Sequence, residues 1–209
     1  TIINTAPTFD VAATILPNTG VVTGTLLTCS ATASDLDDGS VVPTYEWSVS
    51  GVSIATGSTY TVDANDTNVG ENILCTATAT DSDGEVATSN DAVTVENTDP
   101  SVSGTSISGG SYNTDTLTCS ASASDPDESV TIDYTWSIDS VEIGTGTSLD
   151  LATTAALPQD VVVCTASVDD SNGASANDTA SLTLVNRAPS APVVEISPSS
   201  PVAGTDDLV

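Results

Sequence analysis

Four cysteines are the residues with the most definite chemistry in this chain, and they form two pairs with nearly equal spacing. The sequence has no histidine and no Cys-x-x-Cys motif, so these residues do not have the pattern of a zinc site. Paired cysteines with no metal-binding pattern are typical of disulfides that form in an oxidising compartment. The sequence therefore predicts a disulfide-bonded protein located outside the cell or on its surface.

The acidic residues are the second chemical feature. The chain has 29 acidic residues and one basic residue, Arg187, and its formal net charge is -28. Proteins bind phosphate backbones and anionic lipid surfaces through clusters of lysine and arginine, which are missing here. We therefore expect no nucleic-acid partner and no direct membrane contact. Cations in the medium, bound or diffuse, should offset the repulsion between the carboxylates.

Catalysis has few candidate residues. The absence of histidine and lysine, together with the paired cysteines, removes the usual general bases and activated nucleophiles. Two carboxylates acting as in a glycosidase remain conceivable. However, the acids recur in the same loops of each repeat, away from any concentration of aromatic residues that would bind sugar. We therefore predict no catalytic residue and no enzyme activity.

These residues lie in an internal repeat of about ninety residues. Cys29, Trp47 and Cys75 recur as Cys119, Trp136 and Cys164, and the segments NTAP, NTDP and NRAP mark the repeat boundaries. The predicted domains are a first repeat at 1–97, a second repeat at 98–186 and the start of a truncated third repeat at 187–209. Residues 1–4 are a candidate last strand of a preceding repeat, so we expect the chain to be part of a longer array.

The elements that position these residues should be short strands. Alternation of apolar and polar residues occurs at 25–33, 44–50, 58–64, 72–80 and 91–97, between clusters of Gly, Asn, Asp and Ser. Each repeat is therefore predicted to be an all-β, Greek-key, immunoglobulin-like sandwich. In that fold the cysteines belong on the second and sixth strands with the tryptophan between them, so each repeat should hold one disulfide. The expected bonds are Cys29 to Cys75 and Cys119 to Cys164.

The chain resembles the immunoglobulin-like, polycystic-kidney-disease-like and cadherin-like repeats found in tandem in prokaryotic surface proteins. The resemblance covers both full repeats. It is carried by YEW and YTW before the middle strand, by the loops SDLDDG, SDPDE, DSDG and DSNG, and by the Asn-x-x-Pro linkers. Two features depart from these families. No Asp-Phe-Gly-Asp run follows either tryptophan, and Ile73 and Val162 replace the tyrosine of antibody domains.

Oxygen-bearing side chains should gather at one pole of each sandwich, where the incoming linker meets two of the loops. In the first repeat these residues are Asn4, Asp35, Asp37, Asp38, Asp81 and Asp83; in the second they are Asn97, Asp99, Asp125, Asp127, Glu128, Asp170 and Asn172. Calcium binds six to eight such oxygens, and the resemblance to cadherin-like arrays also implies calcium. A second interpretation stays open, in which these residues are solvated turns that keep the surface soluble.

Asn65 and Asn177 begin Asn-x-Thr sequons in predicted loops and are candidate N-glycosylation sites. The leading functional hypothesis is a structural or adhesive repeat array, forming a stalk, fibre or filament. Its partners would be neighbouring repeats, identical chains in a polymer, glycans or other surface proteins. The alternative is a ligand- or carbohydrate-binding module of an adhesin or secreted hydrolase. Two or more tyrosines exposed on one surface would favour this alternative.

Overall fold

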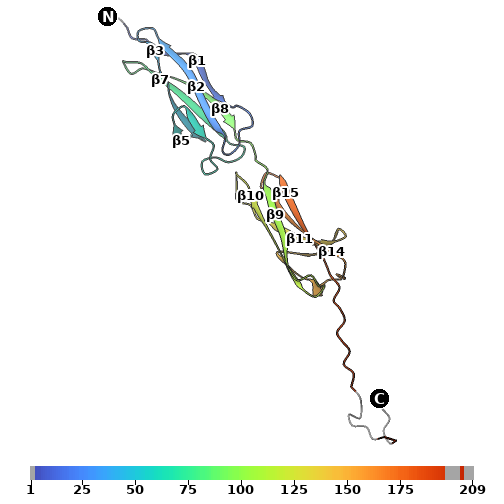
Figure 1. The fold of residues 1–209 in the computed structure, drawn as a ribbon. Helices are drawn as coiled ribbons and strands as arrows, with labels where there is room; N and C mark the ends of the chain where they lie inside the picture. Colours follow the sequence, from blue (N-terminus) through green and yellow to red (C-terminus); the bar gives the residue numbers. More distant parts are fainter. Residues whose placement is uncertain (1–2, 196–202, 205–209) are drawn as a thin grey trace.

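The computed structural model describes residues 3–195 and 203–204, and its regular structure consists of β-strands and one short 3-10 helix. Two β-sandwiches follow each other along the chain and lie end to end, with residues 186–195 extending beyond the second (Figure 1). The predicted all-β fold is confirmed. No described helix is long and apolar enough to cross a bilayer.

The first sandwich packs two four-stranded sheets face to face. One sheet has the order β1-β2-β3 with β6 also paired to β2, and the other has the order β5-β4-β7-β8. All of the pairings are antiparallel. The strands are β1 (Thr8–Leu16), β2 (Leu26–Asp35), β3 (Gly39–Val41), β4 (Thr44–Val49), β5 (Val52–Thr56), β6 (Thr59–Thr61), β7 (Asn72–Thr80) and β8 (Val86–Thr94).

The second sandwich repeats this plan with sheets of three and four strands. Their orders are β13-β10-β9 and β12-β11-β14-β15. The strands are β9 (Ser101–Gly109), β10 (Thr116–Ser124), β11 (Asp133–Ile138), β12 (Val141–Thr145), β13 (Ser148–Asp150), β14 (Val161–Asp169) and β15 (Ser175–Thr183), and the 3-10 helix η1 spans Leu151–Thr153. The described chain has no strand equivalent to β3 between β10 and β11.

Each core is built around a disulfide and a tryptophan. Cys29 on β2 is bonded to Cys75 on β7, and Cys119 on β10 is bonded to Cys164 on β14, as the fold predicted. The tryptophans lie directly across the sheet from the second cysteine of each pair and are fully buried. Each indole Nε1 donates to a glycine carbonyl at 2.8 Å, so burial leaves no unpaired polar group on the ring.

The disulfides make up for small cores. The buried positions are mostly Val, Leu, Ile and Ala, which bury less apolar area than aromatic side chains. The bonds join residues 46 and 45 positions apart. In the chain-entropy model, closing loops of this length stabilises each sandwich by roughly 4 kcal/mol. That is comparable to the whole stability of many small domains.

The edge of β8 is covered by a strand that the alternation did not predict. β1 pairs with β2 on one side, and on the other side its backbone N–H groups donate to side chains of β8. Ile15 N donates to Asp91 Oδ2 at 2.8 Å, and in the second sandwich Thr105 N donates to Asp178 Oδ2 at 3.0 Å. Covering an edge in this way blocks pairing with a further strand.

Several sequence expectations concern residues with little or no described structure. Residues 1–2, within the candidate strand of a preceding repeat, lie outside the described part, as do residues 196–202 and 205–209 of the third repeat. The described residues of 187–195 form no strand. The boundaries at 97 and 186 stay predictions, although both fall between the strands of successive sandwiches.

Candidate functional site at the incoming pole of each repeat

The linker and two loops meet at the incoming pole of each sandwich. The loops are the one that follows β2 or β10 and the one between β7 and β8 or between β14 and β15. Hydrogen bonds between side chains and backbone join the three segments in both repeats. The acidic residues were expected at these poles, and the structure brings most of them there.

A linker asparagine bonds to the second loop in each repeat. Asn4 Nδ2 donates to Asp81 Oδ2 at 2.9 Å, and Asn97 Nδ2 donates to Asp170 Oδ2 at 2.8 Å. The separations of 77 and 73 residues make both bonds long-range contacts. The asparagine that starts each linker therefore has the same structural partner twice.

The next linker residue bonds to the first loop. Thr5 donates from its N and its Oγ1 to Asp37 Oδ2, at 3.0 and 2.9 Å. Thr98 N donates to Asp127 Oδ2 at 2.6 Å. These threonines were not among the predicted site residues because their backbone, which carries no sequence signal, makes the contact in both repeats.

The third connection joins the two loops to each other. Asp38 accepts from the N and Oγ of Ser82 at 2.7 and 3.0 Å. In the second repeat Glu128 Oε1 accepts from Ser171 N at 2.5 Å. The longer glutamate therefore serves in place of the aspartate, while the other residue types of the triangle are the same in both repeats.

Aspartates within the loops also fix the loop backbone. Asp35 Oδ1 accepts from the backbone N of Asp37 and of Asp38, and Asp125 Oδ1 accepts from the equivalent Asp127 and Glu128. Asp81 Oδ1 accepts from the N of Asp83 and Glu85, and Asp170 Oδ1 does the same with Asn172 and Ala174. These bonds are the turn-forming role that the second interpretation assigns to the acids.

The pKa of Asp81 and that of Asp170 are held below the ordinary value of 3.8. The largest cause is the side-chain hydrogen bond from Asn4 to Asp81 and from Asn97 to Asp170, and partial burial acts in the opposite direction. Donors that favour the ionised carboxylate lower its pKa. Both aspartates are therefore ionised at neutral pH, and their charge takes part in binding the linker.

Some buried oxygens at the poles have no hydrogen-bond partner among the described residues. They are Asp35 Oδ2 in the first repeat and Asn97 Oδ1, Thr98 Oγ1 and Asp125 Oδ2 in the second. Asp35 as a whole is only 7% exposed. Buried oxygens are normally satisfied, and carboxylate, amide and hydroxyl oxygens are ligands that suit a hard cation. The donor set thus fits calcium in chemical type.

The acids themselves do not converge around one point. Within residues 3–195 and 203–204, no three Asp, Glu, His or Cys side chains form a group able to hold a metal. A cation at a pole would therefore depend on amide, hydroxyl or backbone oxygens as well as on carboxylates. Asp99, one of the predicted ligands, is exposed and has no hydrogen bond to the other residues of its pole. Asp83 lines an open hollow with Asn4, Asp37 and Glu85.

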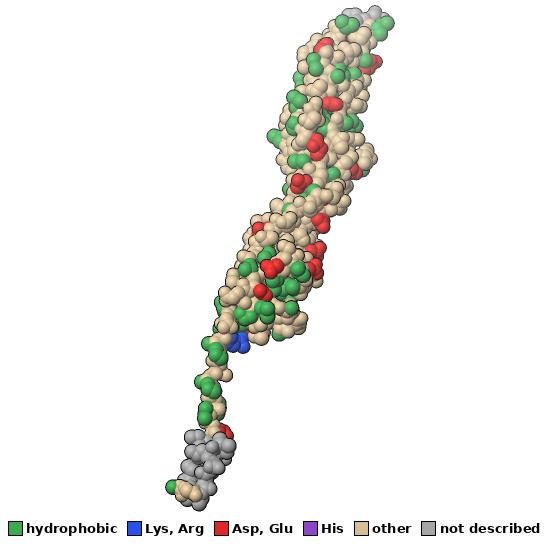
Figure 2. All heavy atoms as spheres, turned by 90° about the vertical axis from the view of Figure 1, so that its right-hand side faces the viewer, with side chains coloured by type: hydrophobic (Ala, Val, Ile, Leu, Met, Phe, Trp, Pro, Cys, Tyr) green, Lys and Arg blue, Asp and Glu red, His purple; other side chains and the backbone are tan. Residues whose placement is uncertain are grey.

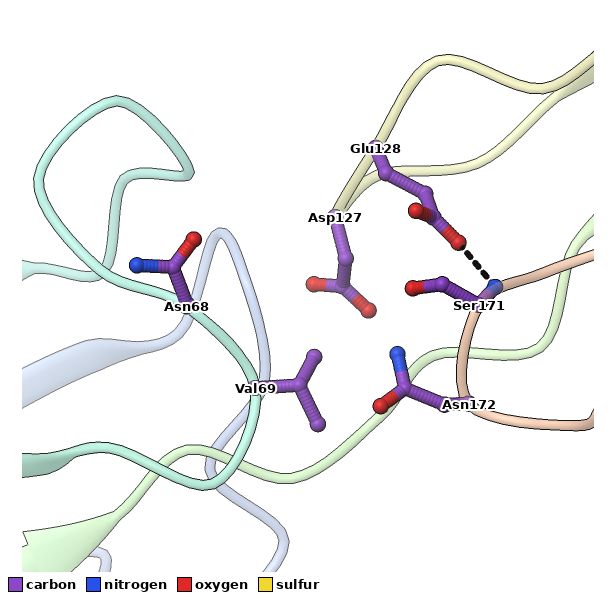
Figure 3. Close-up of a pocket in the computed structure, with 6 residues that line it drawn as sticks. All are labelled: Asn68, Val69, Asp127, Glu128, Ser171 and Asn172. Atoms are coloured by element: carbon purple, nitrogen blue, oxygen red, sulfur yellow. Dashed lines mark hydrogen bonds between the residues drawn. The ribbon is translucent and has the colours of Figure 1, made fainter.

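The pole of the second repeat faces the first repeat across a small cleft (Figure 3). Its volume is about 140 Å³, and it is lined by Asn68, Val69, Asp127, Glu128, Ser171 and Asn172. Thr23 Oγ1 of the first repeat donates to Asp127 Oδ1 at 2.5 Å, so the two sandwiches are in direct contact here. Neither Thr23 nor Asn68 was predicted, because nothing in a single repeat indicates which loop the next repeat touches.

The two predicted glycosylation sites differ in setting. Asn65 is exposed in the loop after β6, and Thr67 of its sequon is buried and donates from its hydroxyl to Asp63 O. Asn177 lies within strand β15 and not in a loop, so that part of the expectation was wrong. Its side chain is exposed, because outward-facing residues of β15 alternate with inward-facing ones. Glycosylation at either residue stays a prediction.

The aromatic residues do not form a sugar-binding face. Tyr60 is buried, and Phe9, Tyr45, Tyr112 and Tyr134 are half-buried. The hydroxyls of Tyr45 and Tyr134 accept from the backbone of the neighbouring sheet at 3.0 and 3.1 Å. The exposed tyrosine pair that would favour a carbohydrate-binding module is therefore missing from the described surface.

Comparisons with known proteins give no family. No protein-family model matches the chain, and no curated protein matches it. The solved structures that are similar in fold include two with low TM-scores. One contains the three N-terminal domains of the highly immunogenic outer capsid protein of bacteriophage RB49, with a TM-score of 0.33, 11% identity, and coverage of 86% of this chain and 71% of the other.

The second similar structure is a Ca²⁺-stabilized adhesin that helps an Antarctic bacterium to bind ice. Its TM-score is 0.32 and its identity is 17%, with coverage of 88% of this chain and 49% of that chain.

Proposed function

We propose that this chain is a structural spacer within an extracellular array of repeats, which holds successive sandwiches in a fixed relation and catalyses no reaction. The main support is the triangle of contacts between linker, first loop and second loop, which recurs in both repeats with the same residue types except that Glu128 replaces Asp38. The contact between the two loops is kept although its acceptor changes from Asp38 to Glu128. We expect this where the function depends on holding the linker and the loops together.

The direct bond between Thr23 and Asp127 supports a stiff joint between the two repeats. Asp127 also accepts from Thr98 of the linker, so one carboxylate holds the first repeat and the linker together. In the first repeat the equivalent Asp37 is exposed, whereas Asp127 is half-buried against its neighbour. The disulfides support an extracellular location, because such bonds persist in oxidising compartments.

The surface composition fits a spacer that works in a salty medium. Figure 2 shows carboxylates spread along both sandwiches and one basic side chain, at the far end of the second sandwich. Like charges in this number extend a chain of domains and keep it soluble. The proposed partners are neighbouring repeats or identical chains, with glycans or other surface proteins as further candidates.

Small-angle X-ray scattering of the whole chain tests the spacer proposal. A stiff joint predicts one narrow distribution of distances between the sandwiches, unchanged between low and moderate salt. A broad distribution, as expected for two sandwiches on a free tether, would overturn the proposal. In a separate experiment, electron microscopy of native material would distinguish a single stalk from a polymer.

We further propose that calcium binds at the poles and stiffens the joints, which the unpartnered oxygens of Asn97, Thr98 and Asp125 support. Thermal unfolding with calcium and with a chelator tests this, since a ligand that binds only the folded form raises its melting temperature. Glu128→Gln should reduce the calcium-dependent shift. Glu142→Gln is the matched control, because Glu142 is exposed on β12 away from the pole. Equal melting temperatures with calcium and with chelator would contradict calcium binding and would favour the interpretation of the loops as solvated turns.

A further inference from the structure

One residue of the junction cleft has chemistry that the spacer role does not use. Asn172 is the only asparagine in the sequence that is followed by glycine. It is exposed, lies in the loop between β14 and β15, and lines the cleft with Asp127 and Glu128 (Figure 3). Its backbone N donates to Asp170 Oδ1, whereas its side-chain amide has no hydrogen bond to the described residues.

We propose that Asn172 is a self-modification site, at which the backbone nitrogen of Gly173 attacks the side-chain amide and converts residue 172 to an acid. The Gly173 N to Asn172 Cγ bond forms, and the side-chain nitrogen leaves as ammonia with the proton taken from Gly173 N. The resulting succinimide ring is opened by water at one of its two carbonyls. The products are aspartate or isoaspartate, and no oxidant or reductant is needed.

The local geometry leaves room for this ring closure. Gly173 has a φ of +94°, and a Cβ built at this position would meet no atom within 4 Å. The attacking nitrogen therefore belongs to a residue with no side chain and open space beside it.

The first repeat shows that the loop accepts the acid product. Asp83 occupies the position equivalent to Asn172, and Gly84 follows it with a φ of +93°. Asp83 N donates to Asp81 Oδ1 at 3.1 Å, the same bond that Asn172 N makes to Asp170 at 2.9 Å. An aspartate at position 172 is thus compatible with the turn, and conversion to aspartate should leave the second sandwich folded.

The conversion would change the charge of the joint. The cleft now presents the carboxylates of Asp127 and Glu128, and an acid at 172 would add a third. The effect of this charge on calcium rests on the calcium binding proposed above. Asn172→Asp should tighten calcium binding at the junction by roughly tenfold, because the added carboxylate attracts the cation at a distance of a few ångström in water. Without cations the added charge should loosen the joint.

Peptide mass spectrometry of the folded chain tests the modification independently of calcium. After incubation at mildly alkaline pH, residue 172 should gain the mass of an amide-to-acid change ahead of every other asparagine, with both aspartate and isoaspartate peptides present. Asn68 is the internal control, because it lines the same cleft but precedes Val69 and donates from its side chain to Glu71. Asn172→Gln should abolish the signal.

Two outcomes would overturn the inference. Asn172 could stay an amide in the folded chain while converting only after denaturation, or Asn68 could convert at the same rate. If the modification occurs but Asn172→Asp leaves the calcium affinity unchanged in a titration, residue 172 is a modification site. The proposal that calcium binds at the junction is then contradicted.

Discussion

Asn97 donates its side-chain amide to Asp170 Oδ2 at 2.8 Å, across the gap between the linker and a loop 73 residues away. The prediction is that Asn97→Ala lowers the melting temperature of the second repeat by a few degrees, because the linker loses its bond to an ionised carboxylate. Asn90→Ala is the control, since Asn90 is exposed on β8 and its side chain has no hydrogen bond to the described residues. Equal effects of the two substitutions in a thermal melt would contradict the prediction.

Acidification should remove this contribution. The asparagine bonds lower the folded-state pKa of Asp81 and Asp170 below 3.8, so their stabilising effect is complete above that pH and is lost as the pH falls through the folded pKa. We predict that the stability difference between the wild type and the Asn4→Ala/Asn97→Ala variant is constant from pH 7 to 5 and shrinks below about 4. Comparing the two proteins cancels the change in total charge. A difference that stays constant to pH 2 would contradict the prediction.

The disulfide of each repeat should act on that repeat alone. We predict that replacing Cys119 and Cys164 by Ala lowers the free energy of unfolding of the second sandwich by roughly 4 kcal/mol, because the unfolded chain is no longer constrained. Urea unfolding followed by tryptophan fluorescence measures this loss, and the Cys29/Cys75 pair provides the reciprocal variant. A loss shared equally by both sandwiches would mean that they unfold as one unit.

The core could be predicted well from the sequence, because the signals for it are either local in the chain or present in both repeats. Trp47 and Trp136, the two cysteine pairs and the alternation at 72–80 all lie where the sandwich required. Strand β1 was missed, because its outer N–H groups bond to side chains of β8 and its exposure does not alternate regularly. The observed β8 also begins at Val86, before the predicted start at 91.

The site was predicted only in part, for a physical reason. The acids of the loops are recognisable from their type, but their partners are backbone N–H groups of Thr98, Ser82 and Ser171, which any residue carries. The contact of Thr23 with the next repeat depends on how two sandwiches lie against each other. Neither kind of contact leaves a pattern in one sequence.

The indole nitrogen of Trp136 should matter beyond its packing. Nε1 donates to Gly146 O at 2.8 Å inside a fully buried core. Trp136→Phe is expected to cost about 1–3 kcal/mol for the unpaired carbonyl, in addition to the lost volume. Urea unfolding gives this value, and Val141→Ala on the exposed edge of β12 should change it little. A cost no greater than that of Val141→Ala would show that the carbonyl finds another partner.

The bond between Thr23 and Asp127 should control the joint and leave the sandwiches unchanged. Thr23→Val keeps the shape of the side chain but removes the donor to Asp127 Oδ1. Hydrogen bonds to charged groups contribute about 1.5–3 kcal/mol, so the ratio of closed to open joints should fall by roughly tenfold or more. Distances between fluorophores on the two sandwiches should therefore broaden, while both melting temperatures stay the same. Thr25→Val, which removes an acceptor for Val22 N within the first repeat, is the control and should leave the distances narrow. Broadening by both variants would assign the effect to the loop as a whole and not to its contact with Asp127.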